Sequence, residues 1–378
     1  MYGIRNGKII LPDRIVEDGV LLFDTAIRGI VSESEAASLC SEIYDAKGNY
    51  VSPGFVDVHV HAYLGEDASD GSSNGIRTIS EGILKNGVTS YCPTTMTVSL
   101  DEIRASFEVC RSLKNESRTW NGAEILGVHA EGPFINPAKK GAQAEEHILP
   151  PEASLILEYA DVISLVTVAP EMDGAEEFIR TVREKTDVEV SIGHTSATYD
   201  ETKRAVGWGA SHATHTFNAM VGIHHRDPGT VGGVLTSPEV YCELIADTFH
   251  VHPGLFSMMY KLKGDHLVVI TDCIRAGGLS EGEYTLGGQA VTVKGIECRL
   301  ADGTIAGSVL KMNKALKNFV ENTDLPLWEA VNLVSRNPAN SVNAHSKGTL
   351  EVGKDADIVL FDDSFDVVSV FKMGEKKF

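Results

Sequence analysis

The chain has 378 residues, of which 43% are hydrophobic and 23% are charged, and this composition excludes the disordered, collagen-like and coiled-coil classes. The formal net charge of −20 repels phosphate backbones and anionic lipids, so we expect no nucleic acid and no membrane among the binding partners. The opening residues lack the pattern of a secretory signal, and six scattered cysteines are typical of reduced thiols. Together these features predict a globular cytoplasmic protein.

Both ends of the chain are rich in short strand-like runs. These runs occur at residues 2–4, 7–11, 19–23, 29–31, 42–45, 347–350, 357–361 and 367–371. Neither end can bury a core by itself, since an isolated hairpin is marginally stable in water. We therefore predict one small β-sandwich domain built from both termini, residues 1–52 plus 344–378.

Residues 53–343 alternate apolar runs with amphipathic stretches, the pattern of βα units and a parallel sheet. Eight strands are predicted, at residues 55–61, 88–94, 124–131, 162–170, 188–194, 212–215, 242–247 and 266–272. Outer helices are predicted between them, among others at residues 100–113, 175–185 and 200–208. Eight such units close into a barrel, so the predicted fold class is α/β, a (β/α)8 TIM-like barrel that carries the small β domain.

Polar residues gather at the carboxyl ends of these strands, where barrel enzymes place their catalytic groups. His59 and His61 lie two residues apart, so both side chains leave the same face of the first strand and can share one metal ion. A single histidine in a strand is more often a packed core residue, but here six polar residues occupy equivalent positions. They are His59, His61, Glu131, His194, His215 and Asp272.

The residue types at these positions indicate a divalent metal, since imidazole and carboxylate groups suit Zn²⁺ or Fe²⁺. A carboxylate at the buried end of a strand, such as Glu131, is costly without a cation or hydrogen-bond donors; its alternative is a helix cap or a salt bridge. Beside a metal, Asp272 can act as a general base toward water, and its alternative is to cap a turn. One or two ions per subunit are both compatible with this set.

Several segments resemble the amidohydrolase superfamily and, within it, the deacetylases of amino-sugar phosphates. His-Val-His at 59–61 is common to the superfamily, whereas His-Ala-Glu-Gly-Pro at 129–133 and Thr-His-Thr-Phe-Asn-Ala-Met at 214–220 are specific to the deacetylases. The resemblance covers nearly the whole chain and implies the same two-domain fold. It implies metal-dependent hydrolysis of N-acetylglucosamine 6-phosphate to glucosamine 6-phosphate and acetate. The alternative substrates are N-acetylgalactosamine 6-phosphate or a cyclic amide.

The resemblance also implies roles at matching positions. Glu131, His194 and His215 are expected to bind the principal metal and Asp272 to be the catalytic acid and base. His59 and His61 are expected to bind a second ion, with Glu131 or Asp272 as a bridge. Substrate contacts are implied for Ala142, Gln143, Asn218, Ala219, Arg226, Asp247, His250, Ile305, Ala306 and Gly307.

The sugar phosphate is expected to lie against Arg226 and His250, which would supply the local positive charge that an acidic protein needs. Taken alone, Arg226 could equally form a surface ion pair. In the family some contacts come from a neighbouring subunit, which implies a homodimer with these two residues near its interface.

Two departures from relatives bear on the chemistry. Gln143 stands where some relatives carry a histidine that polarises the scissile carbonyl, and a second metal, Gln143 or His147 could take that role. The fourth predicted strand contains no lysine, the residue with which dihydroorotase and hydantoinase bridge their metals, and this argues against those subfamilies. A non-catalytic, metal-stabilised scaffold is disfavoured because all six polar residues are present.

Overall fold

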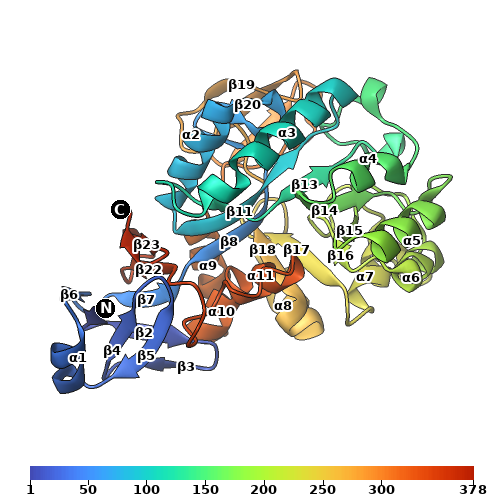
Figure 1. Cartoon of the computed structure of the whole chain (residues 1–378). Helices are drawn as coiled ribbons and strands as arrows, with labels where there is room; N and C mark the ends of the chain where they lie inside the picture. Colours follow the sequence, from blue (N-terminus) through green and yellow to red (C-terminus); the bar gives the residue numbers. More distant parts are fainter.

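The computed structural model describes all 378 residues, and a nearly closed barrel of parallel strands forms its centre (Figure 1). The strands follow in the order β8 (Phe55–Val60), β11 (Val88–Thr95), β12 (Glu124–Ile125) with β13 (Val128–Glu131), β14 (Ile163–Val168), β15 (Glu189–Ile192), β16 (His212–Ala213), β17 (Tyr241–Ile245) and β18 (Leu267–Ile270). All eight predicted barrel strands are present, which confirms the predicted fold class. The third strand is interrupted at Gly127, where an added Cβ would lie 2.0 Å from Ser164 Oγ.

The first and last barrel strands are joined by polar bonds at the carboxyl end. The Asp57 carboxylate on β8 accepts hydrogen bonds from the Thr271 hydroxyl at 2.6 Å and from its backbone N–H at 3.3 Å. The backbone N–H of Asp272 donates to the carbonyl of His59 at 2.9 Å. Burial raises the pKa of Asp57 to about 7. This closure sets Asp272 directly beside His59.

Helices cover the outside of the barrel (Figure 1). They are α2 (Ser73–Leu84), α3 (Leu100–Ser117), α4 (Ala153–Glu158), α5 (Ala175–Lys185), α6 (Tyr199–Trp208), α7 (Gly229–Leu235), α8 (Phe256–Lys263), α9 (Met312–Glu321), α10 (Leu327–Leu333) and α11 (Arg336–Ser341). The three predicted helices match α3, α5 and α6, and α3 continues past the predicted end. In α3 a capping box of Ser99 and Glu102 starts the helix, and Ile103 and Phe107 bury its inner face.

Both termini build a separate sheet-rich domain, at the lower left of Figure 1. One sheet has the order β5 (Ile27–Val31), β4 (Val20–Phe23), β1 (Tyr2–Arg5), β6 (Glu42–Asp45), and helix α1 (Glu33–Leu39) lies beside it. The other has the order β24 (Glu375–Lys376), β23 (Val367–Lys372), β22 (Ile358–Phe361), β7 (Tyr50–Pro53), β2 (Lys8–Leu11), β3 (Arg14–Val16). Phe23 from the first sheet and Val51 and Phe371 from the second share one buried cluster, so the two sheets pack as a sandwich.

The predicted strand at 347–350 is wrong, because residues 347–349 form a bend and the Lys347 side chain is buried. The boundaries predicted for the two domains stay a prediction.

A three-stranded sheet outside the barrel and the sandwich, here called the third sheet, was not predicted. It consists of β19 (Gly282–Leu286), β20 (Gln289–Lys294) and β21 (Glu297–Leu300), and it follows the last barrel strand. Shorter elements near the barrel mouth and between helices are β9 (Ala62–Tyr63), β10 (Glu66–Asp67) and the 3-10 turns η1 (Ala68–Asp70), η2 (Pro137–Lys139), η3 (Glu145–His147), η4 (Pro253–Leu255) and η5 (Gly264–His266). Gln289 donates from Nε2 to the carbonyl of Ala142 at 2.5 Å, so the third sheet contacts the loop after β13.

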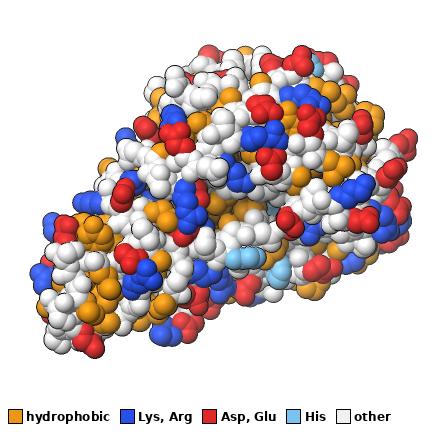
Figure 2. Space-filling model, viewed as in Figure 1, with side chains coloured by type: hydrophobic (Ala, Val, Ile, Leu, Met, Phe, Trp, Pro, Cys, Tyr) orange, Lys and Arg blue, Asp and Glu red, His pale blue; other side chains and the backbone are white.

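The surface mixes acidic and basic side chains over the face in view in Figure 2. All six cysteines are unpaired and five are buried, as the sequence predicted. None of the helices is both long and apolar enough to span a membrane.

A buried ion cluster ties the C-terminal segment to the barrel. Lys347 Nζ lies 2.6 Å from Glu124 Oε2 on β12, 2.8 Å from Asp357 Oδ2 and 3.0 Å from Asp355 Oδ2. Burial disfavours the charged amine, yet the carboxylates of Asp357 and Glu124 outweigh it and raise the pKa of Lys347. Lys347 is therefore the cation that three carboxylates share at the junction, and Arg118 adds a second cation to one of them, Asp355, at 3.0 Å.

Lys347→Met is expected to lower the free energy of unfolding by about 3–5 kcal/mol, because it leaves buried carboxylates without their partner. Urea unfolding followed by circular dichroism measures the change. The matched control is Lys317→Met, which removes an exposed pair with Glu321 at 3.7 Å and is expected to cost less than about 0.5 kcal/mol. Equal effects of the two variants would contradict the role given to Lys347.

Candidate metal centre

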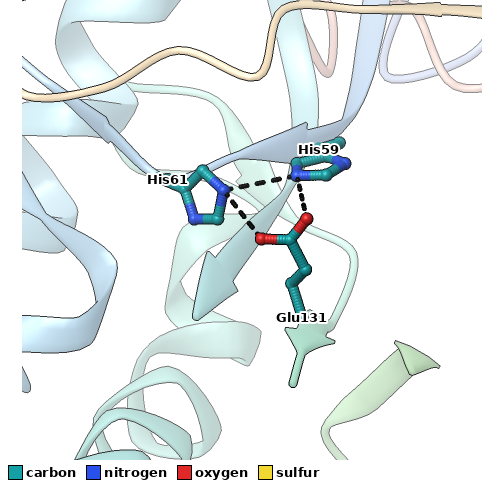
Figure 3. A group of neighbouring side chains, drawn as sticks. All are labelled: His59, His61 and Glu131. Atoms are coloured by element: carbon teal, nitrogen blue, oxygen red, sulfur yellow. Dashed lines mark hydrogen bonds and ion pairs between the residues drawn. The ribbon is translucent and has the colours of Figure 1, made fainter. Parts of the chain in front are cut away.

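Four imidazoles surround one carboxylate at the barrel mouth. On one side of Glu131, His61 Nε2 lies 3.2 Å from Oε2 and His59 Nε2 lies 3.5 Å from Oε1, with the two imidazole nitrogens 3.3 Å apart (Figure 3). On the other side, Oε1 lies 3.0 Å from His215 Nε2 and 3.2 Å from His194 Nε2. These two nitrogens are 3.1 Å apart. All five predicted metal ligands therefore converge, although they come from β8, β13 and the ends of β15 and β16.

These separations suit metal ions. Two ligand atoms on a tetrahedral zinc ion, each at about 2.0–2.1 Å from it, lie about 3.3 Å from one another, and the nitrogen and oxygen atoms here are 3.0–3.5 Å apart. His59, His61 and Glu131 form one group able to hold an ion, and Glu131, His194 and His215 form another. The donor set therefore fits one divalent ion on each side of the shared carboxylate.

The protonation of the imidazoles also favours metal binding. Each Nδ1 faces an acceptor: the carbonyl of Thr94 for His61 (3.1 Å), of Lys139 for His194 (2.8 Å) and of Asn218 for His215 (3.1 Å), and Glu243 Oε2 for His59 (2.9 Å). These acceptors favour the hydrogen on Nδ1, so that each ring, once neutral, offers the lone pair of Nε2 to an ion beside Glu131.

Three of the converging residues have a left-handed backbone conformation, which residues other than glycine rarely adopt. The φ angles are 48° for His194, 30° for His215 and 50° for Asp272. Such conformations cost about 1–3 kcal/mol each and gather at functional sites. Backbone bonds hold them: the carbonyl of His194 accepts from Asn136, and that of Asp272 accepts from Ser308. The strained ends aim the three side chains across the barrel mouth.

The charges of the cluster reinforce one another when no metal is bound. Burial opposes the charged carboxylate of Glu131, but His59 and His194 outweigh it and hold its pKa well below the usual range. Burial likewise opposes the His215 imidazolium, yet the Glu131 carboxylate raises the pKa of His215 to about 9. Two acids and several bases with opposed pKa shifts in one cleft are typical of an active site.

Asp272 lies at the open side of the cluster. Its Oδ1 is 3.3 Å from His61 Nε2 and 3.6 Å from His59 Nε2, and 7% of the residue is exposed, toward a cavity of about 350 Å³. Burial acts against ionisation, but His59 and His61 lower the pKa of Asp272, so the carboxylate is ionised at neutral pH. It can accept a proton from a molecule in the cavity.

Most of the predicted substrate residues line this cavity. Those that do are Ala142, Gln143, Asn218, Ala219, His250, Ile305 and Gly307, together with Lys139, Met96, Leu286 and Thr304, which the sequence did not single out. Lys139 is the cation among these additions. Leu286 comes from the unpredicted third sheet, so this sheet forms part of the cavity wall.

Three predicted contacts lie elsewhere. Ala306 is fully buried behind the wall. Asp247 supports His250, whose Nδ1 it meets at 2.6 Å. Arg226 is exposed on the loop before α7, with Nη1 2.6 Å from His225 Nε2, and it does not line the cavity of its own chain.

Gln143 contacts the metal centre directly. Its Nε2 donates to Glu131 Oε2 at 2.6 Å, and its Oε1 accepts the backbone N–H of Thr97 at 2.6 Å. His147 lines a neighbouring cavity of about 440 Å³ that shares Gln143 with the first, and it does not line the cavity with the metal centre. Of the two residues proposed for polarising the carbonyl, Gln143 is the one at the site.

The sequence analysis missed a layer of polar residues beneath the centre. Glu243, His129 and His212 are all fully buried, and His59, His129 and Glu243 form a third group of close ligand atoms. Burial and nearby His59 lower the pKa of His129 to about 3, so its ring is neutral. A signal was present, since Glu243 is an acid in the middle of the apolar run Tyr-Cys-Glu-Leu-Ile.

Comparison with known proteins identifies the family to which this chain belongs. The model of the amidohydrolase family matches residues 50–377, and the chain belongs to this family. N-acetylglucosamine-6-phosphate deacetylase of Lysinibacillus sphaericus is 38% identical over 335 residues, 87% of this chain and 86% of that protein. N-acetylgalactosamine-6-phosphate deacetylase of Escherichia coli O157:H7 is 34% identical over 95% of this chain and 93% of its own.

A solved structure has the same fold over its full length. N-acetylglucosamine-6-phosphate deacetylase from Pasteurella multocida superposes with a TM-score of 0.94 at 31% identity, covering 99% of each chain. The likeness includes the small domain as well as the barrel, because so little of either chain is left out.

Metal-free protein is expected to lose stability as the pH rises from about 6.5 to about 9. The pKa of His215 is about 9 in the folded chain and about 6.5 when unfolded. Its charge therefore stabilises the fold fully below pH 6.5, and this contribution is lost as the pH passes 9. Thermal unfolding of chelator-treated protein from pH 6 to 10 measures the trend.

Two controls accompany this test. In metal-free His215→Gln, the melting temperature is expected to depend less on pH. Zn²⁺ added to the wild-type protein is expected to restore its stability at high pH, because the ion binds neutral imidazole. A melting temperature that is constant or rises over this interval in the metal-free protein would contradict the charge assignment.

Proposed function

We propose that this chain hydrolyses N-acetylglucosamine 6-phosphate to glucosamine 6-phosphate and acetate in a metal-dependent reaction. The observation that carries the proposal is the convergence of four imidazoles and Glu131 beside Asp272 at the floor of one cavity. Membership of the amidohydrolase family and the near full-length similarity to named deacetylases support the substrate class.

Two groups of close ligand atoms support the assignment of residues to metals. Glu131, His194 and His215 would hold the principal ion, and His59, His61 and Glu131 would hold a second. A divalent ion bound there, Zn²⁺ or Fe²⁺ by its ligands, would polarise the acetyl carbonyl and make water more acidic. Gln143 Nε2 keeps Glu131 in place from the cavity side.

Asp272 performs the proton transfers. Its carboxylate takes a proton from the attacking water as the new carbon–oxygen bond forms, and it returns that proton to the sugar nitrogen as the carbon–nitrogen bond breaks. The immediate products are acetic acid and the free amine, and Asp272 ends in its starting ionised state; the acid then gives up its proton to the amine or to solvent and leaves as acetate. Its position between the imidazoles and the open cavity serves both transfers.

The sugar phosphate needs cations in a protein of net charge −20. His250, held by Asp247, and Lys139 line the cavity and are assigned to the substrate of their own chain. Arg226 is exposed and outside its own cavity, so we assign it to the phosphate of a substrate in a second copy of the chain. The proposal therefore includes a homodimer, in the cytoplasm as the composition predicts.

N-acetylgalactosamine 6-phosphate is the second candidate substrate, since a relative named for that activity is 34% identical over 95% of this chain. The two sugars differ in the orientation of one hydroxyl. A cyclic amide is disfavoured because β14, the fourth barrel strand, carries no lysine.

The direct test is acetate release by metal-reconstituted protein from four substrates: both N-acetylhexosamine 6-phosphates and both sugars without phosphate. We expect the glucosamine 6-phosphate derivative to have the highest kcat/KM and loss of the phosphate to lower it by about 10–100-fold, the worth of a charge-assisted hydrogen bond. Preference for the galacto epimer would favour the second candidate, and no acetate from any of the four would refute the deacetylase.

Asp272→Asn is expected to lower kcat by about 10²–10⁴-fold, because the amide cannot accept the proton. Steady-state acetate release under saturating substrate measures it, with bound metal quantified in the same sample. Asp363→Asn changes an exposed carboxylate and serves as the matched control with unchanged kcat. Near-normal turnover of the Asp272 variant with metal bound would exclude the assigned role.

Mixing two inactive variants tests whether Arg226 acts on a neighbouring copy. In a mixed dimer of Arg226→Ala and Asp272→Asn, one site keeps Asp272 and receives Arg226 from its partner. After exchange of subunits, activity is expected to return to about a quarter of the wild-type value, because half of the dimers carry one intact site out of two. Absence of any recovery, with mixed dimers present, would place Arg226 outside the partner's site.

A further inference from the structure

Glu243 is a buried acid that the proposed reaction does not use. It lies at the middle of β17 and is 0% exposed. No lysine or arginine pairs with it; its ion-pair partners are the imidazoles of His59 at 2.9 Å and His212 at 3.6 Å. A carboxylate in such a place is costly unless its bonds and charge serve the fold or a nearby cation.

One oxygen of Glu243 bonds to both halves of the metal centre. Oε2 accepts a hydrogen bond from His59 Nδ1–H at 2.9 Å and another from the backbone N–H of His215 at 2.8 Å. The backbone carbonyl of Glu243 also accepts from the N–H of Thr216 at 2.9 Å. His59 belongs to one group of ligands around Glu131, and His215 belongs to the other.

The hydrogen bond from His59 to Glu243 fixes which ring nitrogen of His59 carries the hydrogen. With the hydrogen on Nδ1, the bare Nε2 points at His61 and Glu131, 3.3 and 3.5 Å away. The opposite tautomer would turn an N–H toward the centre, where no ion could bind it. Among the four imidazoles of the centre, His59 is the one whose Nδ1 is held by a carboxylate rather than a backbone carbonyl.

The bond to His215 holds a strained turn. His215 has φ of 30°, and its side chain crosses the barrel mouth to reach Glu131 at 3.0 Å. Its backbone N–H has Glu243 Oε2 as its acceptor, so loss of that oxygen would leave a buried donor unpaired and free the turn to relax.

The second oxygen of Glu243 has no hydrogen-bond partner. It lies 3.6 Å from His212 Nδ1, beyond hydrogen-bond distance, and the ring of His129 packs edge-on against His59 with centroids 4.6 Å apart. The carboxylate therefore keeps negative charge directly beneath the metal centre, where it favours cations.

We propose that Glu243 is a positioning residue that couples the two metal subsites, fixing the tautomer of His59 for one ion and the turn at His215 for the other. This inference rests on the proposed function, since it takes over the metal ligands assigned there. It assigns Glu243 no contact with substrate. One residue on β17 would then set the affinity of ions bound by residues on or just after four other strands, β8, β13, β15 and β16.

The experiment compares metal binding by wild type and Glu243→Gln. Glutamine keeps the length of the side chain, but its neutral amide oxygen accepts both bonds less strongly than a carboxylate does, and the negative charge beneath the centre is lost. Titration of metal-free protein with Co²⁺, followed by calorimetry and by the visible absorption of the ion, is expected to show both equivalents bound about 10–100-fold more weakly and an altered spectrum. Circular dichroism verifies that the variant is folded.

Two further variants keep the test decisive. Glu243→Asp retains the charge but is too short to span both donors, and it is expected to weaken both equivalents as well, so it replaces the first variant if that one does not fold. Glu124→Gln removes another buried barrel carboxylate, paired with Lys347, and is expected to bind Co²⁺ with wild-type affinity even if it unfolds more easily.

Wild-type affinity and spectrum in a folded Glu243 variant would overturn the proposal, and weakening of a single equivalent would overturn the coupling. The readout does not depend on turnover. A wild-type protein that binds two equivalents but releases no acetate would refute the proposed function and leave this test valid.

Discussion

The structure of the site depends on one buried anion, the carboxylate of Glu131. It is 2% exposed, with two imidazole nitrogens on each side at 3.0–3.5 Å and the Gln143 amide at 2.6 Å. A carboxylate removed from water costs several kcal/mol unless cations or donors surround it. The barrel mouth is built to supply them, and the same arrangement of nitrogen and oxygen atoms suits divalent metals.

Closure of the barrel brings Asp272 to this anion. Asp57 bonds to Thr271, and Asp272 bonds through its backbone to His59, so the two ends of the barrel sheet meet at the metal centre. The left-handed turns at His194, His215 and Asp272 are costly, and a packed barrel with many backbone bonds can hold them where a flexible loop could not. The strained backbone at the barrel mouth therefore lowers the stability of the fold but fixes the directions of these three side chains.

The parts outside the barrel shape access and stability. The β19–β21 sheet contributes Leu286 to the cavity wall and reaches the loop after β13 through Gln289. The small domain needs both termini for its core, and Lys347 ties it to β12. Ligand-bearing strands and a remote domain are therefore parts of one folded unit, which the full-length likeness to a solved deacetylase reflects.

The local sequence pattern alone determined the eight barrel strands, the two β-rich ends and the polar residues at the ends of the strands. The reason is that the spacing of apolar residues within a short segment distinguishes strands from helices. It did not determine the third sheet, whose strands are half exposed. It also did not determine the bend at Lys347, where long-range ion pairs override the local strand pattern. Only the tertiary structure decided that Glu243 bonds to His59, 184 residues away, that Gln143 bonds to Glu131, and that Arg226 lies outside its own cavity. Such contacts depend on how distant strands pack in space, and the local preferences of short segments do not specify that packing.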